Sequence, residues 1–176
     1  MAGAASFPVE VPDVETLRLI ILQDITDRRK AKDELVIERN LLRSLIDNLP
    51  DRIYVKDPQG RKILANTADM HASGARAMQD ILGKTDFDLY PKELAESFWA
   101  DDRLVLEKEN SVLNHEETGL DVNGNPVWVM TSKVPVYDSQ NSVIGLVGIG
   151  RDITNQKNIE LEISRQKQFY ETLVLN

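Results

Sequence analysis

Hydrophobic and polar residues alternate over five short stretches of the chain, and a period of two predicts β-strands. Residues 52–57 and 62–65 form the first pair, joined by the turn-forming sequence Asp57-Pro58-Gln59-Gly60. The other three strands are expected at residues 112–120, 126–136 and 143–150. Along residues 126–136 hydrophobic side chains occupy both parities, so the pattern does not decide which face of this strand is buried.

A helical pattern separates the two groups of strands. Residues 93–109 space their hydrophobic side chains three and four positions apart, which predicts an amphipathic helix. Shorter helical pieces are expected within residues 67–91, where Gly74 and Gly83 interrupt the chain. The order of elements predicts an α+β fold, with a five-stranded antiparallel sheet, short helices on one face, and flanking N- and C-terminal helices.

One sequence pattern occurs twice, and Asp24-Ile25-Thr26 in the first copy corresponds to Asp152-Ile153-Thr154 in the second. In each copy an alternating hydrophobic run precedes the tripeptide, which predicts a strand, near residues 19–21 in the first copy. A charged stretch without glycine or proline follows, which predicts a helix that the tripeptide caps.

This repeat suggests a division of the chain. Residues 1–26 are interpreted as the tail of a preceding repeat or as a disordered segment, and residues 27–48 as a connecting amphipathic or coiled-coil helix. Residues 49–154 form the central module, and residues 155–176 form a C-terminal helix that leads towards the next module.

The two helices share a heptad-like spacing of hydrophobic residues. In the first helix the seam contains Leu35, Leu42 and Leu45, spaced by seven and three positions. Such a seam favours contact between two helices and therefore a homodimer. The alternative is an amphipathic helix that packs against its own domain.

The central module resembles a PAS domain. The resemblance rests on spaced motifs in the family's order, namely IYVKDPQG, ILAN, GKTDFDLYP, ELAESFWADD, NPVWVMTSKVPVYD and GLVGIGRDIT, and it extends over residues 40–157. It implies the PAS fold (close to the PAS_4 subgroup, with its C-terminal DIT tail) and one repeat of a multi-PAS bacterial sensor protein such as a histidine kinase. An adjacent PAS repeat and a C-terminal output domain are then expected as partners.

The resemblance implies a non-catalytic sensory module of a two-component system. A pocket or redox signal would pass through Asp152, Ile153 and Thr154 into the C-terminal helix. One alternative is a structural dimerisation spacer that binds no ligand, and another is the sensory part of a diguanylate cyclase.

Composition narrows the chemistry. The chain of 176 residues has no cysteine, two histidines and a net charge of -8. The missing thiols exclude disulfides, thiolate zinc sites and cysteine-linked flavin. The acidic balance argues against nucleic acid as a partner. No hydrophobic run is long enough for membrane insertion, so a cytoplasmic protein is expected.

Several groups of residues resemble catalytic or metal-binding motifs, but none has the required context. His115-Glu116-Glu117 lies in an expected strand, whereas the histidine motifs that it resembles need a helix. Either Asp86 or Asp88 is interpreted as the cap of a short helix, and the pair at 101–102 as a solvated helix face. We therefore expect no catalytic residues and no metal site.

The family's pocket lies between the sheet and the central helices, and candidate lining residues follow from that placement. They are Tyr54, Asn66, His71, Trp99, Val129, Met130 and Thr131. The haem-binding members carry their axial histidine near the position of Ala100 or Asp101, so haem is disfavoured. No cofactor is expected, and the remaining candidate is a small ligand of unknown identity.

Overall fold

The computed structural model describes residues 14–174, with side chains described for residues 27–171. The chain divides into two compact units, residues 1–44 and residues 45–176. The first unit consists, where described, of most of helix α1 (Val14–Asp47). This stretch contains neither glycine nor proline, and Pro50 follows its end.

The start of α1 corrects one sequence prediction. The strand expected near residues 19–21 is helical, and Asp24-Ile25-Thr26 lies inside α1 instead of capping it. A strand needs a neighbour for its backbone N–H and C=O groups, whereas a helix pairs its own. The described residues before β1 include no other strand that could supply such pairing.

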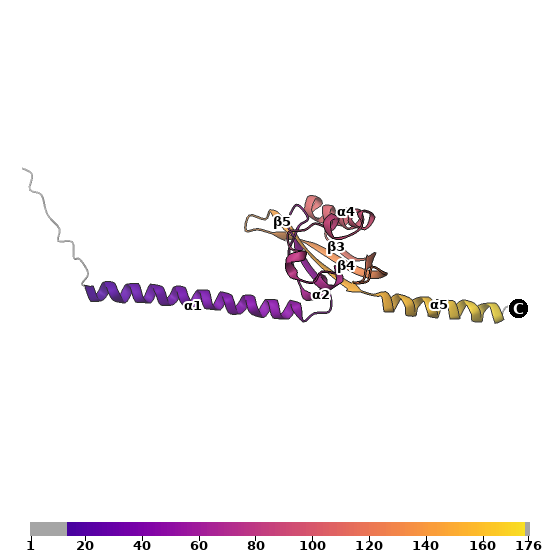
Figure 1. The fold of residues 1–176 in the computed structure, drawn as a ribbon, viewed down its shortest axis with the longest axis horizontal. Coiled ribbons are helices and arrows are strands. Elements are labelled where there is room, and N and C mark those ends of the chain that lie inside the picture. The colour runs from indigo at the N-terminus through magenta and orange to yellow at the C-terminus, as the bar shows by residue number, and fades with distance from the viewer. Residues whose placement is uncertain (1–13, 175–176) are drawn as a thin grey trace, which may run out of the picture. The chain divides into compact units, whose positions relative to one another are not determined.

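The second unit is built on one antiparallel sheet with the order β2-β1-β5-β4-β3 (Figure 1). Its strands are β1 (Arg52–Lys56), β2 (Lys62–Ala65), β3 (Val112–Leu120), β4 (Pro126–Tyr137) and β5 (Val143–Asp152). The expected turn joins β1 to β2, and Gly60 adopts a φ of +76° there while its N–H donates to the carbonyl oxygen of Asp57. The five-stranded antiparallel sheet and the α+β class are confirmed.

Three short elements and one longer helix lie between β2 and β3, and a second long helix follows β5. They are α2 (Thr67–Ala72), the 3₁₀-helix η1 (Met78–Asp80), α3 (Asp86–Leu89), α4 (Lys92–Lys108) and α5 (Thr154–Val174). Helix α4 packs against β3, β4 and β5 (Figure 1). The inner face of the sheet is therefore the face that α4 covers.

Strand β4 shows which side chains face the helices. Val127, Val129, Thr131 and Lys133 alternate along it and are all buried. Trp128 lies on the other face and remains 42% exposed. The burial of these side chains thus shows which face of β4 points to the helices, a question that the hydrophobic pattern left open.

Candidate functional site

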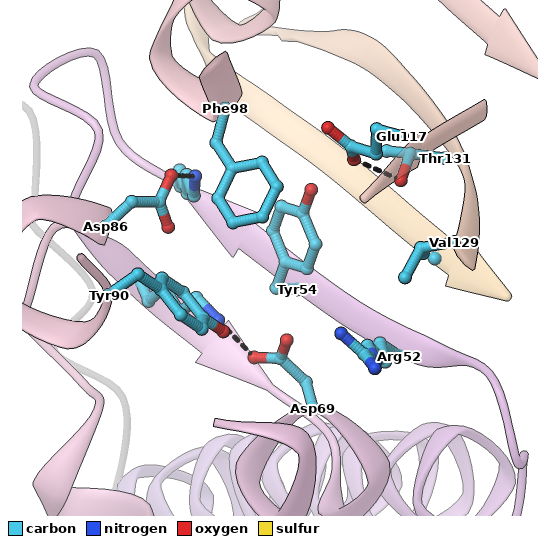
Figure 2. Close-up of a pocket in the computed structure, with 12 residues that line it drawn as sticks. Arg52, Tyr54, Asp69, Asp86, Tyr90, Phe98, Glu117, Val129 and Thr131 are labelled. Atoms are coloured by element: carbon cyan, nitrogen blue, oxygen red, sulfur yellow. Dashed lines mark hydrogen bonds and ion pairs between the residues drawn. The ribbon is translucent and has the colours of Figure 1, made fainter. Parts of the chain in front are cut away.

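A polar cavity lies between the inner face of the sheet and the helices. The space open to the centre of a water molecule is about 40 Å³, enough for a few waters. Its lining consists of Arg52, Tyr54, Lys56, Lys62, Asp69, Asp86, Tyr90, Phe98, Glu117, Val129, Thr131 and Gly150. Figure 2 shows the ring of Tyr54 at the centre, between Phe98 and Glu117. The cavity is small, and most of its lining residues are polar or charged.

Two buried lysines share one buried aspartate beside this cavity. Asp102 of α4 is 0% exposed, and its Oδ2 lies 2.6 Å from Nζ of Lys56 on β1. Its Oδ1 lies 2.8 Å from Nζ of Lys133 on β4. Lys56 also pairs with Asp86, and Lys133 donates to the carbonyl oxygen of Phe98 at 3.0 Å. Charged side chains are rarely buried unless they are paired, and each of these has an opposite charge beside it.

A second buried ion pair closes the β2 side of the cavity. Nζ of Lys62 lies 2.6 Å from Oδ2 of Asp69, and both side chains are almost fully buried. Asp69 lies in α2, whose N-terminus is capped by Asn66. This pair therefore ties the first helix of the module to the edge of the sheet.

The charges around the cavity displace the pKa values of their neighbours. Burial opposes ionisation of Asp102, but the ammonium groups of Lys56 and Lys133 outweigh it and hold the pKa of Asp102 below its usual value. Burial likewise opposes the charged form of Lys56, yet Asp86 and Asp102 raise its pKa. Burial, followed by the surrounding carboxylates, raises the pKa of Tyr54 well above 10.0. Tyr54 therefore presents a protonated hydroxyl at neutral pH.

Glu117 of β3 has a carboxylate that the network of the lining leaves incompletely paired. Its Oε1 accepts a hydrogen bond from the hydroxyl of Thr131 at 2.5 Å. Its Oε2 is buried and has no hydrogen-bond partner. Burial is the main reason why the pKa of Glu117 is raised. A buried acceptor without a donor is costly and marks a place where a ligand can bind.

The structure places three of the sequence-predicted pocket residues in the lining, namely Tyr54, Val129 and Thr131. Met130 does not belong to it, because side chains alternate along β4 and that of Met130 lies on the outer face. Trp99 lines a separate small cavity beside Gly60.

Two further candidates also lie elsewhere. Asn66 is buried, but its Oδ1 accepts from the backbone N–H of Asp69 at 2.9 Å and from that of Ile53 at 3.0 Å, so it supports the α2 N-terminus. His71 is an exposed residue of α2.

The lysines and aspartates of the cavity were missed by the sequence reasoning. The pair Asp101 and Asp102 was expected on a solvated helix face, and both are buried. Their lysine partners lie in strands far away in the sequence, so the residues next to the two aspartates do not indicate the pairing. The sequence does contain a sign that Lys133 is buried. It follows Val129 and Thr131 at alternate positions of β4, so the three side chains share one face of the strand. Asp88 is correctly expected as a capping residue, because its carboxylate accepts from the N–H of Thr85 at 2.8 Å.

The segment Asp152-Ile153-Thr154 joins the sheet to α5. Oδ1 of Asp152 accepts from the N–H of Thr154 at 2.9 Å, in the manner of a helix cap. Ile153 is buried, and its N–H donates to the carbonyl oxygen of Trp128 at 2.9 Å. The N–H of Trp128 in turn donates to Oγ1 of Thr154 at 2.9 Å. The base of α5 is thus held by β4 as well as by β5.

A side-chain contact adds β3 to this junction. Lys157 of α5 lies with its Nζ 2.6 Å from Oε2 of Glu116 and 5.9 Å from the centre of the Trp128 ring. The hydrogen bond to Glu116 raises the pKa of Lys157. The junction therefore consists of Glu116, Trp128, Lys157 and the tripeptide Asp152-Ile153-Thr154.

The described part of the chain combines one antiparallel sheet, a cavity under its helices, and a last strand that continues into a helix. A family model described as PAS fold matches residues 46–158. The chain therefore belongs to the PAS fold family.

Known proteins that this chain resembles include signalling proteins. The chain is 27% identical to the methanogenesis regulatory histidine kinase FilI of Methanothrix harundinacea, over 88% of this chain and 17% of that protein. It is 29% identical to a diguanylate cyclase of Vibrio cholerae, over 71% of this chain and 43% of that protein. The chain thus spans less than half the length of these curated relatives.

Solved structures of VqmA are also similar. A structure of VqmA bound to DPO is 28% identical, with a TM-score of 0.56 over 62% of this chain and 55% of that one. A structure of the Vibrio cholerae VqmA dimer is 28% identical, with a TM-score of 0.58 over 64% of this chain and 50% of that one. Among the described residues, no helix is both long and apolar enough to cross a membrane.

Proposed function

We propose that this chain is a ligand-sensing module of a longer signalling protein, in which the state of the cavity controls how α5 leaves the sheet. The output domain of that protein, such as a histidine kinase or a diguanylate cyclase, would follow α5, and another sensory repeat would precede α1. The small share of FilI that the chain covers supports this placement.

One observation carries the proposal: cavity and junction use neighbouring residues of the same two strands. On β3, Glu117 lines the cavity and the adjacent Glu116 pairs with Lys157. On β4, Val129 lines the cavity and the backbone of Trp128 holds the tripeptide. Side chains of successive strand residues point to opposite faces, so a shift of either strand at the cavity moves its contact with α5.

The cavity favours a small polar ligand. A donor that reaches Oε2 of Glu117 would satisfy the unpaired acceptor and shift the balance of hydrogen bonds with Thr131. The binding of DPO by VqmA, a protein of the same fold, supports a small molecule as the class of ligand. No enzymatic chemistry is required of the module itself.

The first test is native mass spectrometry of the purified protein, followed by thermal shift with small polar metabolites. A co-purifying small molecule, or a rise in Tm that Glu117→Gln and Thr131→Val abolish, is expected. Met130→Leu is the matched control, because this neighbour points away from the cavity. A response that all three variants share equally would contradict binding in this cavity.

Relay through α5 is tested in the longer protein. Insertions of one to seven residues after Lys157 rotate the outgoing helix in steps, and the output is expected to vary with a period of seven. A flat response to these insertions would reject a coiled-coil lever.

A structural spacer is the second candidate, and the pairing within the cavity favours it. Lys56, Lys62 and Lys133 already have carboxylate partners in the structure. A spacer would show neither a co-purifying ligand nor a thermal shift.

We further propose that the module forms a homodimer through the seam on α1. Leu35 is 67% exposed and Leu42 is 56% exposed within the described chain, so their side chains are open to a second helix. The dimeric state of VqmA supports this arrangement.

A further inference from the structure

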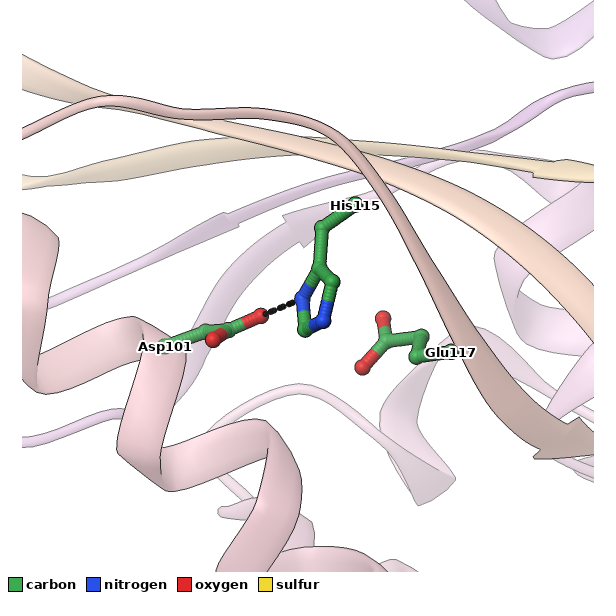
Figure 3. A group of neighbouring side chains, drawn as sticks. All are labelled: Asp101, His115 and Glu117. Atoms are coloured by element: carbon green, nitrogen blue, oxygen red, sulfur yellow. Dashed lines mark hydrogen bonds and ion pairs between the residues drawn. The ribbon is translucent and has the colours of Figure 1, made fainter.

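Three side chains that could serve a metal ion lie at the edge of the cavity. Asp101 belongs to α4, whereas His115 and Glu117 lie two residues apart on β3 and so share one face. One ligand atom from each lies within 4.8 Å of the other two (Figure 3). The sequence had predicted no metal site, because a histidine and a glutamate at this spacing on a strand match no familiar motif.

The imidazole of His115 is already held on one side. Its Nδ1 lies 2.7 Å from Oδ2 of Asp101, and its other nitrogen faces the carboxylate of Glu117 (Figure 3). The two ring nitrogens point in widely different directions, so one ion cannot bind Nε2 and also reach a carboxylate that is bonded to Nδ1. Asp101 is therefore suited to orient the ring, in the manner of the carboxylate–histidine pairs that support metal ligands.

The carboxylate of Glu117 has one oxygen without a hydrogen-bond partner. Its Oε1 is engaged by Thr131, while Oε2 is buried without any hydrogen-bond partner. A hydrogen-bonded carboxylate with one unused oxygen is a usual form of a metal-ligating glutamate. His115 is 46% exposed, so an ion can reach its imidazole from solvent.

We propose that His115 Nε2 and Glu117 Oε2 bind a divalent cation, with Asp101 as the positioning residue and water completing the coordination. Imidazole together with carboxylate suits Zn²⁺ better than Mg²⁺ or Ca²⁺, which prefer oxygen alone. Nζ of Lys133 lies 3.9 Å from Oδ2 of Asp101 and offsets part of the local negative charge. With two protein ligands and a nearby cation, the site is an exchangeable one.

An ion at this position would affect the contact between β3 and α5. Glu117 lines the cavity, and its neighbour Glu116 holds Lys157 of α5, so an ion on β3 acts directly on the strand that contacts the outgoing helix. The ion needs no ligand in the cavity, and a ligand that donates to Oε2 of Glu117 would compete with it.

The composition of the chain provides a matched control for a test of zinc binding. It contains two histidines and no cysteine, so the exposed His71 is a matched control for His115. Zn²⁺ is titrated by calorimetry into tag-free protein that has been treated with a chelator. One equivalent is expected to bind the wild type and His71→Ala, and His115→Ala is expected to lose it.

Two further variants separate ligand from positioning residue. Glu117→Gln should abolish binding, whereas Asp101→Asn should weaken it by about 10- to 100-fold. Long-range ¹H–¹⁵N NMR spectra give a second readout, since Nε2 of His115 and not Nδ1 should shift on addition of Zn²⁺. Loss of binding in His71→Ala, retention in His115→Ala, or no binding by the wild type would each overturn the proposal. Thermal unfolding of each variant confirms that it is folded.

Discussion

Lys157 in the first turn of α5 is paired with Glu116 of β3, with 2.6 Å between Nζ and Oε2. The contact joins the outgoing helix to β3, which is not the strand immediately before α5 and does not pair with β5. It brings the edge strand β3 into the junction, next to a residue that lines the cavity.

Lys157→Gln should loosen the base of α5. Without the ion pair, amide hydrogen exchange is expected to accelerate over the first two turns of α5 and to change little in β4 and β5. Lys167→Gln is the control, since Lys167 lies further along the same helix and its Nζ is 4.0 Å from Glu171. Equal acceleration in both variants would show that the contact with β3 does not anchor the helix.

Asp102→Asn should destabilise the domain strongly. The substitution removes the negative charge that Lys56 and Lys133 share, so these buried cations lose a carboxylate partner. The free energy of unfolding is expected to fall by about 3–5 kcal/mol. Urea unfolding measures the change. Glu96→Gln removes the partner of an exposed lysine on the same helix, Lys92, and should leave the stability unchanged. Similar midpoints for the two variants would mean that the buried network contributes little.

The same network predicts how stability varies with pH. The folded pKa of Asp102 lies below its ordinary value of 3.8, so its contribution is complete above pH 3.8 and is lost as pH falls through the lowered value. The folded pKa of Lys56 lies above 10.5, so its contribution is complete below pH 10.5 and is lost as pH rises through the raised value.

Unfolding free energies of the wild type and Asp102→Asn should therefore converge at acid pH and differ by a constant amount in the neutral range. Denaturant curves at a series of pH values check this. A difference that is largest in acid would contradict the assigned charge states.

Gly148→Ala should disturb the cavity through Tyr54. A Cβ at position 148 would lie 2.2 Å from Cζ of Tyr54, so the ring must move, and overpacking of this kind costs about 1–3 kcal/mol. In a Tyr54→Ala background the same substitution should cost much less. A double-mutant cycle in urea measures the coupling, and strictly additive effects would show that the ring accommodates the methyl group freely.

Leu35→Lys together with Leu42→Lys should convert the proposed dimer into a monomer, because charges at these seam positions would repel each other across the helix pair. Light scattering after size exclusion measures the mass. Ile37→Lys is the matched control, since Ile37 is also 67% exposed but lies off the seam. An unchanged mass of the double variant, or dissociation by the control alone, would reject the seam.

The fold was predictable from the sequence because its signals are local. The turn of Asp57-Pro58-Gln59-Gly60 and the alternation in β1 and β5 depend on near neighbours, and both features are present in the structure. The first Asp-Ile-Thr tripeptide shows the limit of such signals. The second copy joins a strand to a helix because Trp128 of β4 supplies its hydrogen-bond partners, and the first copy lies within α1.

Among the residues that line the cavity, only uncharged ones were predicted from the sequence. Tyr54, Val129 and Thr131 followed from the placement of the pocket in the PAS family, whereas Asp101 and Asp102 were predicted to lie on a solvated helix face. Two adjacent carboxylates are buried here because Lys133 and Lys56 approach from separate strands. Charge pairing of this kind depends on the tertiary structure, so a short stretch of sequence does not show it.

Gly148 has a mechanical consequence for the strand that leads into α5. It pairs with Tyr54 of β1 on one side and with Lys133 of β4 on the other, and the two strands that flank it carry the lysines bridged by Asp102. The carboxylate of one helix thus fastens both neighbours of β5 while β5 itself offers no side chain at that point. The ions of a simple salt would gain little by competing with the lysines that already pair with Asp102. We expect the stability of this buried network to change little with salt concentration.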